Sequence, residues 1–197
     1  MAQGPIDFWF TIGSIYTYLA VMRLPDVSRQ TGIAFRWRPF SIRTLMIEMD
    51  NRPMKVPAKL AYMWRDMARR AQAQGFPYRD RPPYPLQNLD LANRVALVGS
   101  EEGWCEAYTR AAYLRWFTRH EEPGSAGADT ASLREIGQDT QRVLARADSD
   151  EVKQRYEAAT GEARALGIFG VPTFAVGPEL FWGDDRLDDA IAWYREA

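Results

Sequence analysis

The stretch Phe10-Thr11-Ile12-Gly13-Ser14-Ile15-Tyr16-Thr17-Tyr18 sets the layout of the chain, because an apolar run of strand character ends there at a glycine and a helical pattern begins at a serine. Ser14 is therefore predicted to be the N-cap of that helix, with a hydroxyl that can satisfy one free N–H group of the first turn. The positive end of the helix dipole lies beside it and favours an anion. Two interpretations stay open at this point: Ser14 only caps a helix, or it also contacts an anionic group.

The residues around this stretch predict a strand-helix-strand unit. Residues 6–11 alternate in polarity and predict a first strand, and the helix opened by Ser14 is predicted to end at Gly32. Residues 33–39 alternate again and predict a second strand that a proline closes. Such a unit implies a right-handed crossover and parallel pairing of the two strands.

A long helical block follows, and strand patterns return only near the C-terminus. Between the predicted helices, the Pro- and aromatic-rich segment 75–85 is a candidate pocket wall, and the loop 121–130 is expected to be mobile. The predicted helices of the block are 56–74, 90–100, 103–119, 131–146 and 149–167.

The C-terminal residues predict a hairpin and a closing helix. Residues 171–176 and 179–182 have strand character on either side of Gly177-Pro178, and a helix with Leu187 inward follows. Without the helical block, the order of elements is that of a thioredoxin-like domain. We therefore predict an α/β fold in which residues 1–45 and 167–197 form a discontinuous thioredoxin-like domain and residues 46–166 form an all-helical insertion domain.

Composition excludes several classes of function. With 25 basic and 26 acidic side chains the net charge is −1, and there is no basic block suited to nucleic acid. No apolar run approaches 18 residues and the N-terminus lacks a leader pattern, so we expect a cytoplasmic protein without a membrane partner. Cys105 is the only cysteine and His120 the only histidine, which excludes an intrachain disulfide and a structural zinc site. We expect a buried, inert Cys105, a surface His120 and no metal site.

Five segments carry a resemblance to a known family, in the same order along nearly the whole chain. They are residues 13–20, 51–53, 56–63, 167–174 and 181–187. With these segments the chain resembles the 2-hydroxychromene-2-carboxylate isomerases and the related kappa-class glutathione transferases, which are thioredoxin-fold proteins with an inserted helical domain. One departure is Ile15, because many members have proline there; proline is permitted in a first helical turn but not required.

The resemblance implies that Ser14 is the catalytic residue and donates a hydrogen bond to the sulfur of bound glutathione. A helix N-terminus and a hydroxyl donor both stabilise a thiolate. Ser14 and Thr17 stand where the disulfide-exchange branch of the fold has its two cysteines. The protein therefore has no thiol pair of its own for disulfide exchange, and glutathione supplies the thiol instead.

The resemblance also implies residues that hold glutathione. The Val171 backbone would pair with the peptide as an added strand does, and Val171-Pro172 would be a cis bond, although an ordinary trans proline is the common case. The charged γ-glutamyl end would meet Asp184, Asp185 and Arg186, while helix capping is the alternative role of Asp184. Contacts to glutathione or substrate are assigned to Asn51 and Lys59, although Lys59 alone would be interpreted as a solvated helix residue.

The activity implied by the family is the glutathione-dependent interconversion of 2-hydroxychromene-2-carboxylate and trans-o-hydroxybenzylidenepyruvate, a step in the breakdown of naphthalene-type aromatics. An aromatic wall for this small substrate is assigned to Tyr16, Trp64 and Tyr84. Two alternatives remain: a glutathione transferase that conjugates electrophiles, and a glutathione- or aromatic-binding protein without turnover. We also expect a homodimer, from the family and from aromatics predicted to be exposed, namely Trp9, Trp37 and Trp116.

Overall fold

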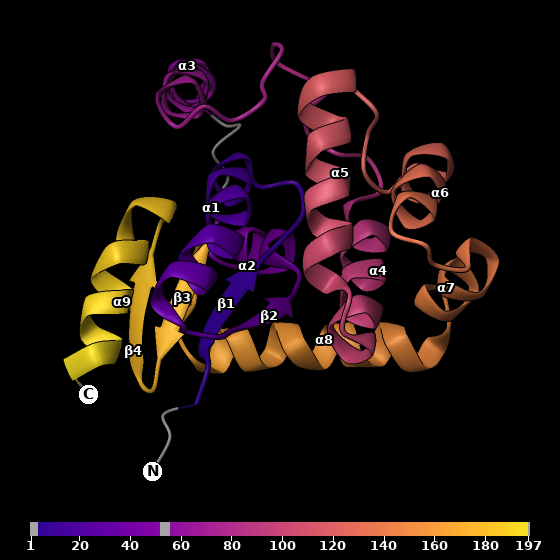
Figure 1. Ribbon diagram of the computed structural model, residues 1–197. Coiled ribbons are helices and arrows are strands. Elements are labelled where there is room, and N and C mark those ends of the chain that lie inside the picture. Colours follow the sequence, from indigo (N-terminus) through magenta and orange to yellow (C-terminus); the bar gives the residue numbers. More distant parts are fainter. Residues whose placement is uncertain (1–3, 52–55, 197) are drawn as a thin grey trace.

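Figure 1 shows the computed structural model of the protein, which describes residues 4–51 and 56–196. The strands β1 and β2 are parallel, and β1–β3 and β3–β4 are antiparallel pairs, so the sheet is mixed, with the order β2-β1-β3-β4. The predicted parallel pairing of the strand-helix-strand unit and the predicted hairpin are both confirmed. The strands are β1 (Ile6–Phe10), β2 (Phe35–Pro39), β3 (Thr173–Val176) and β4 (Glu179–Trp182).

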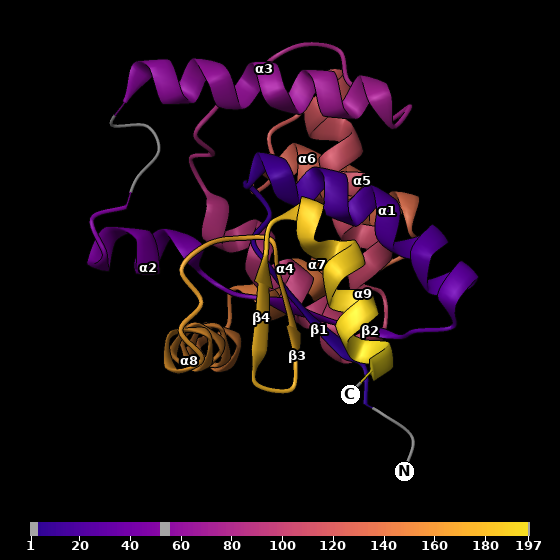
Figure 2. The same ribbon diagram turned by 90° about the vertical axis from the view of Figure 1, so that its left-hand side faces the viewer.

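Helices surround this sheet (Figures 1 and 2), and the helical block continues to one side of it (Figure 1). The first helix starts directly after Ser14 and stops at Gly32, whose φ of 72° is in the left-handed region that favours glycine. The helices are α1 (Ile15–Thr31), α2 (Ile42–Glu48), α3 (Pro57–Ala73), α4 (Leu89–Glu102), α5 (Cys105–Arg119), α6 (Ala126–Glu135), α7 (Thr140–Ala147), α8 (Asp150–Ala165), the short 3-10 helix η2 (Asp184–Arg186) and α9 (Leu187–Glu196).

The alternation of β1 separates two apolar clusters. Phe8 and Phe10 pack with residues of α1 and α9, and that cluster continues into α4 and α5. Trp9 points the other way and packs with Phe40 and with residues of α2 and α8. Because the first cluster runs from the sheet into the helical block, the sheet and the helical block share one core. The division into residues 1–45, 46–166 and 167–197 stays a prediction.

Two features of the helical block differ from the prediction. The helix predicted over 131–146 is two helices, α6 and α7, separated by Gly137 with a φ of 73°. Each has its own cap, because Ser125 accepts a hydrogen bond from the Ala128 N–H and Asp139 from the Arg142 N–H. The loop predicted over 121–130 is therefore helical from Ala126 onward. The short helix α2, capped by Ser41, was not predicted at all.

The tryptophans expected at the surface are not there. Trp9 and Trp116 are fully buried, and the half-buried Trp37 lies edge-on to Phe8 with 4.9 Å between ring centroids. Strand β1 is covered on both faces, and Trp116 faces inward from α5, so sequence alternation alone misassigned them. The tryptophans with about half of their surface exposed are Trp182 and Trp193. In the described part of the chain, no helix has the length and apolar character that crossing a bilayer requires.

Candidate functional site

Ser14 lies in the turn that joins β1 to α1, at the N-cap of the helix with an extended backbone. Its side chain does not cap α1, which corrects the expectation that the hydroxyl would satisfy a first-turn N–H. The Ser14 hydroxyl instead donates to the carbonyl oxygen of Val171 at 3.3 Å. This distance is long for an O–H···O bond, so the hydroxyl is only weakly engaged. Ser14 is half-buried among buried neighbours, which leaves a polar group and the helix N-terminus accessible together.

The predicted peptide-binding loop meets Ser14 in space. The Val171–Pro172 peptide bond is cis, as the family resemblance implied. The Pro172 carbonyl accepts a hydrogen bond from the Gly183 N–H at 2.9 Å, which ties this loop to the segment that begins η2. Ser14, Val171-Pro172 and residues 184–186 are therefore brought together from both ends of the chain.

Asp184 is buried and paired with an arginine of α3. Its carboxylate accepts two hydrogen bonds from the Arg70 guanidinium, at 2.8 and 2.6 Å, and only 1% of its side chain is exposed. Burial raises the pKa of Asp184 to about 6, and the charge of Arg70 opposes that rise. The Arg23 guanidinium also donates to the Asp184 carbonyl oxygen at 3.1 Å. The Asp184 side chain is not a helix cap, because η2 follows Gly183 without a side-chain cap.

The two other predicted residues of this segment are exposed. Arg186 pairs with Asp185 at 3.2 Å and with Asp189 at 2.8 Å. Solvent-exposed pairs of this kind are weak and exchange partners easily. Asp185 and Arg186 therefore offer one negative and one positive group beside the cis-proline loop.

The predicted aromatic residues occupy different environments. Tyr16 is half-buried, and its hydroxyl donates to the Asp66 carboxylate of α3 at 3.0 Å. Trp64 is 5% exposed and lies edge-on to Tyr84, with 5.3 Å between ring centroids. Burial raises the pKa of Tyr84, so this phenol stays neutral at ordinary pH. Trp64 is therefore mainly a core residue, whereas the rings of Tyr16 and Tyr84 are partly exposed.

Asn51 and Lys59 are exposed residues on either side of segment 52–55. Arg52 and Pro53, which belong to one of the family segments, lie outside the described residues. The Asn51 N–H donates to the Met46 carbonyl oxygen at 2.9 Å, at the end of α2. Lys59 lies near the start of α3. Their assignment to ligand contacts stays a prediction.

The chain matches a known protein family along nearly its whole length. The model of the DsbA-like thioredoxin domain matches residues 5–192 of the chain. The chain belongs to this family. A 2-hydroxychromene-2-carboxylate isomerase from Sphingobium xenophagum is 29% identical over 186 residues, covering 93% of this chain and 94% of the relative. Glutathione s-transferase kappa 2 from Caenorhabditis elegans is 24% identical, covering 97% and 92%.

A solved structure shares the fold of this DsbA-like domain. The structure of a 2-hydroxychromene-2-carboxylate isomerase superposes with a TM-score of 0.87 at 24% identity, covering 97% of this chain and 94% of that one. At this identity the likeness establishes the fold. It extends through the helical block, so the block is part of the shared architecture and not an addition of this chain.

The single thiol of this DsbA-like domain is not in an environment that suits a redox role. Cys105 is buried in α5 and burial raises its pKa to about 12, so the thiolate is not formed near neutral pH. Thr17 is fully buried one turn after Ser14. His120 lies at the end of α5 beside Asp80. The inert, buried Cys105 predicted from the sequence is confirmed.

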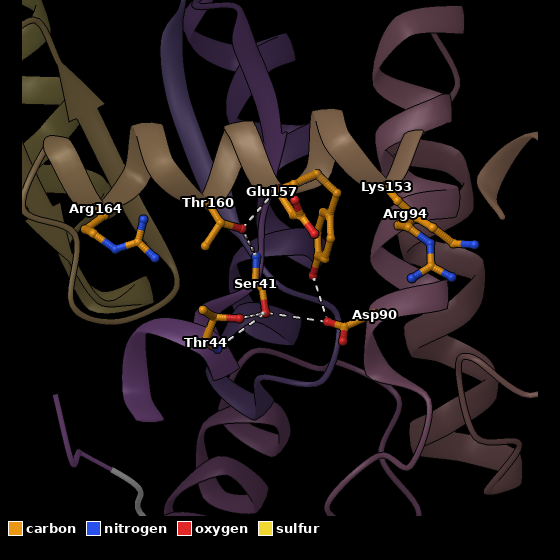
Figure 3. Close-up of a pocket in the computed structure, with 9 residues that line it drawn as sticks. Ser41, Thr44, Asp90, Arg94, Lys153, Glu157, Thr160 and Arg164 are labelled. Carbon is orange, nitrogen blue, oxygen red and sulfur yellow. Dashed lines mark hydrogen bonds between the residues drawn. The ribbon is translucent and has the colours of Figure 1, made fainter. Parts of the chain in front are cut away.

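A polar cavity of about 470 Å³ lies between α2, α4 and α8, and its lining does not include Ser14 (Figure 3). Its polar groups bond to one another: the Tyr156 hydroxyl donates to Asp90 at 3.3 Å, and the Ser41 N–H donates to the Thr160 hydroxyl at 3.0 Å. At its edge Arg164 pairs with Glu48 at 2.7 Å, and Glu48 lies one turn of α2 after Thr44. We interpret this network as a structural one that holds the three helices together.

Sequence reasoning missed three residues that contact the site: Arg70, Asn93 and Tyr113. Arg70 holds Asp184, and the other two hold the backbone of the Ser14 turn. A signal for Asn93 was present, since an amide inside the apolar pattern of α4 indicates a buried polar contact. No pattern indicated Arg70 or Tyr113, because their partners lie far away in the sequence.

Proposed function

We propose that the protein is a glutathione-dependent isomerase that interconverts 2-hydroxychromene-2-carboxylate and trans-o-hydroxybenzylidenepyruvate. The observation that carries the proposal is the Ser14 hydroxyl, which does not cap α1 and lies at the helix N-terminus in a chain whose single thiol is buried. Such a site can hold a thiolate that another molecule brings. The names of the relatives at 25–29% identity support the choice of reaction.

The chemistry of the donor set fits glutathione. Ser14 would donate to the sulfur, and the Val171 backbone would pair with the peptide as a strand edge does. The Val171 carbonyl now accepts the Ser14 hydroxyl at 3.3 Å, so a peptide that takes over this carbonyl releases the hydroxyl. Asp185 and Arg186 are exposed and of opposite charge, which suits the ammonium and carboxylate of a γ-glutamyl group.

Asp184 has a different role in this proposal from the one the family resemblance implied. Its carboxylate is buried against Arg70, so it holds the 184–186 segment in place instead of meeting the ligand first. When bound, glutathione would supply the thiolate nucleophile that makes rotation about the conjugated double bond possible. Tyr16 and Tyr84 would border the substrate ring with the edge of Trp64 behind them, and Lys59 and Asn51 would steady its carboxylate.

Analysis of the products tests the reaction. With glutathione present, trans-o-hydroxybenzylidenepyruvate should be converted to 2-hydroxychromene-2-carboxylate while the amount of glutathione stays constant. Protein freed of glutathione should be inactive, and desulfurised glutathione should compete for the site without supporting turnover. Loss of glutathione into a thioether with simple electrophiles, without isomerisation, would identify the second candidate, a kappa-class-like transferase, which the relative from Caenorhabditis elegans favours. Binding without either reaction would leave a binding protein.

We further propose a homodimer in the cytoplasm. The buried Trp9 and Trp116 no longer support the dimer, but another apolar surface does. Phe169 and Trp182 are each about half exposed, and their rings lie 4.8 Å apart beside the edge strand β4. Light scattering at micromolar concentration should give twice the 22.5 kDa of the chain, and a value of one chain mass would reject the dimer.

A further inference from the structure

Side chains of α4 and α5 form hydrogen bonds with the backbone of the turn that carries Ser14. Asn93 of α4 is fully buried, and its side-chain oxygen accepts the Ile12 N–H at 2.7 Å. Its amide nitrogen donates to the Ile12 carbonyl at 3.0 Å and to the Leu89 carbonyl at 2.8 Å. One side chain therefore satisfies both backbone groups of Ile12, as a neighbouring strand would do.

Tyr113 of α5 approaches the same turn from another side. It is fully buried, and its hydroxyl lies 2.8 Å from the Ser14 carbonyl oxygen and 3.1 Å from the Thr11 carbonyl oxygen. The hydroxyl has one proton to donate and meets two acceptors. Burial raises the pKa of Tyr113, so the proton is present throughout the accessible pH range.

These contacts fix the orientation of peptide planes in the turn, and they therefore fix the direction of the N–H donors in those planes. A carbonyl and the following N–H belong to one rigid unit. Holding the Thr11 carbonyl and the Ile12 N–H fixes the first plane of the turn at both ends, and holding the Ile12 carbonyl fixes the next plane. Holding the Ser14 carbonyl fixes the Ile15 N–H, which is one of the free donors at the start of α1. The direction of that donor and of the Ser14 side chain is thus set by the helical block.

We infer that Asn93 and Tyr113 are positioning residues for the anion site at Ser14, a role that rests on the proposed thiolate function. Neither residue touches the ligand. They hold the Ser14 turn in the one orientation in which the hydroxyl and the first-turn N–H groups meet the sulfur. The helical block therefore takes part in the chemistry by holding the turn and not only by forming a pocket wall.

The chain offers a matched control on the same helix. Tyr108 of α5 is also a fully buried tyrosine, and its hydroxyl donates to Asp129 at 3.0 Å, on the side of α6. Tyr113→Phe and Tyr108→Phe each remove one buried hydroxyl and keep the ring. Their effects on stability should be of the same order, but only Tyr113→Phe releases the Ser14 turn.

The test compares these two variants in turnover and in titration of the glutathione thiol. For Tyr113→Phe we expect kcat to fall about tenfold with KM changed less than about twofold, and the pKa of bound glutathione to rise by about one unit. Tyr108→Phe should leave all three values near those of the unaltered protein. Equal values for the two variants, or a loss confined to KM, would overturn the inference.

Hydrogen exchange separates this inference from the proposed function. The hydrogen-bonded amide of Ile12 should exchange about tenfold faster in Tyr113→Phe than in Tyr108→Phe, without any ligand present. If the unaltered protein shows no glutathione-dependent activity, the proposed function fails. The difference in amide exchange rate between the two variants still tests whether Tyr113 holds the turn. If activity is present but exchange at the turn is equal in both variants, the positioning role fails alone.

Discussion

Replacing Ser14 by alanine should lower turnover by about two orders of magnitude, the scale for removing one hydrogen-bond donor to a developing or bound anion. The protein should fold normally. Because the Ser14 hydroxyl does not cap α1, the variant should lose less than the roughly 1 kcal/mol that a lost cap costs. Steady-state kinetics and urea unfolding on the same preparation measure both quantities.

A second serine gives the opposite pattern and serves as the control. Ser125 caps α6, where its hydroxyl accepts the Ala128 N–H at 3.3 Å. Ser125→Ala should therefore lose about 1 kcal/mol of stability and keep its turnover. Near-normal turnover in Ser14→Ala would reject the role given to this hydroxyl.

Replacing Arg70 by methionine should destabilise the protein by about 3 kcal/mol near pH 8, because it leaves the Asp184 carboxylate buried without its partner. The side chain of Asp184 is 1% exposed, whereas that of Arg70 is 27% exposed. The loss of stability therefore comes mainly from the buried Asp184 carboxylate. The neighbouring variant Arg69→Met is the matched control, since the side chain of Arg69 is 48% exposed and pairs with Asp66 on the same helix. That change should stay within about 0.5 kcal/mol.

The effect of Arg70→Met should depend on pH in a defined direction. Asp184 has a pKa of about 6 in the folded protein, above the unfolded value of about 3.9, so the folded state holds a proton that the unfolded state has released between these values. The contribution of Asp184 to stability therefore falls as pH rises through this window. Without Arg70 the folded pKa moves higher, and the fall continues to higher pH.

Below pH 5 the carboxyl is protonated in both folded proteins, so the difference between Arg70→Met and the unaltered protein should shrink there. Urea unfolding at pH 4.5 and pH 8 measures this difference. Adding Asp184→Asn to Arg70→Met removes the buried charge and should recover most of the loss at pH 8. A penalty that is equal at both pH values, or that survives in the double variant, would show that Arg70 stabilises the protein by packing alone.

Local sequence patterns predicted the parts of the fold that depend on local physics. The alternation in β1 and β2, the glycine that ends α1 and the turn between β3 and β4 are each decided within a few residues. The interpretation of 121–146 failed because two capping residues, Ser125 and Asp139, were not recognised as such in a segment rich in glycine. Capping signals there outweigh the loop-forming composition.

The candidate site was predictable only where family segments or turn chemistry marked it. Ser14 and the cis Val171-Pro172 bond were found in this way. The pairs that hold the site join distant parts of the chain: Arg70 with Asp184 across 114 positions, Asn93 with Ile12 across 81 and Tyr113 with Ser14 across 99. Such contacts are created by packing, and a single sequence carries no local trace of them. The buried state of Asp184 followed from the same packing.

In the proposed mechanism, Ser14 and the start of α1 stabilise a thiolate that the protein does not itself possess. This stabilisation is tested by adding glutathione to the protein at neutral pH and recording the ultraviolet absorbance of thiolate, with desulfurised glutathione as the blank. Cys105 contributes no signal because its pKa is about 12. We expect a saturable thiolate absorbance that Ser14→Ala diminishes. Saturable binding of glutathione with no thiolate absorbance, or full isomerase activity in protein stripped of glutathione, would contradict it.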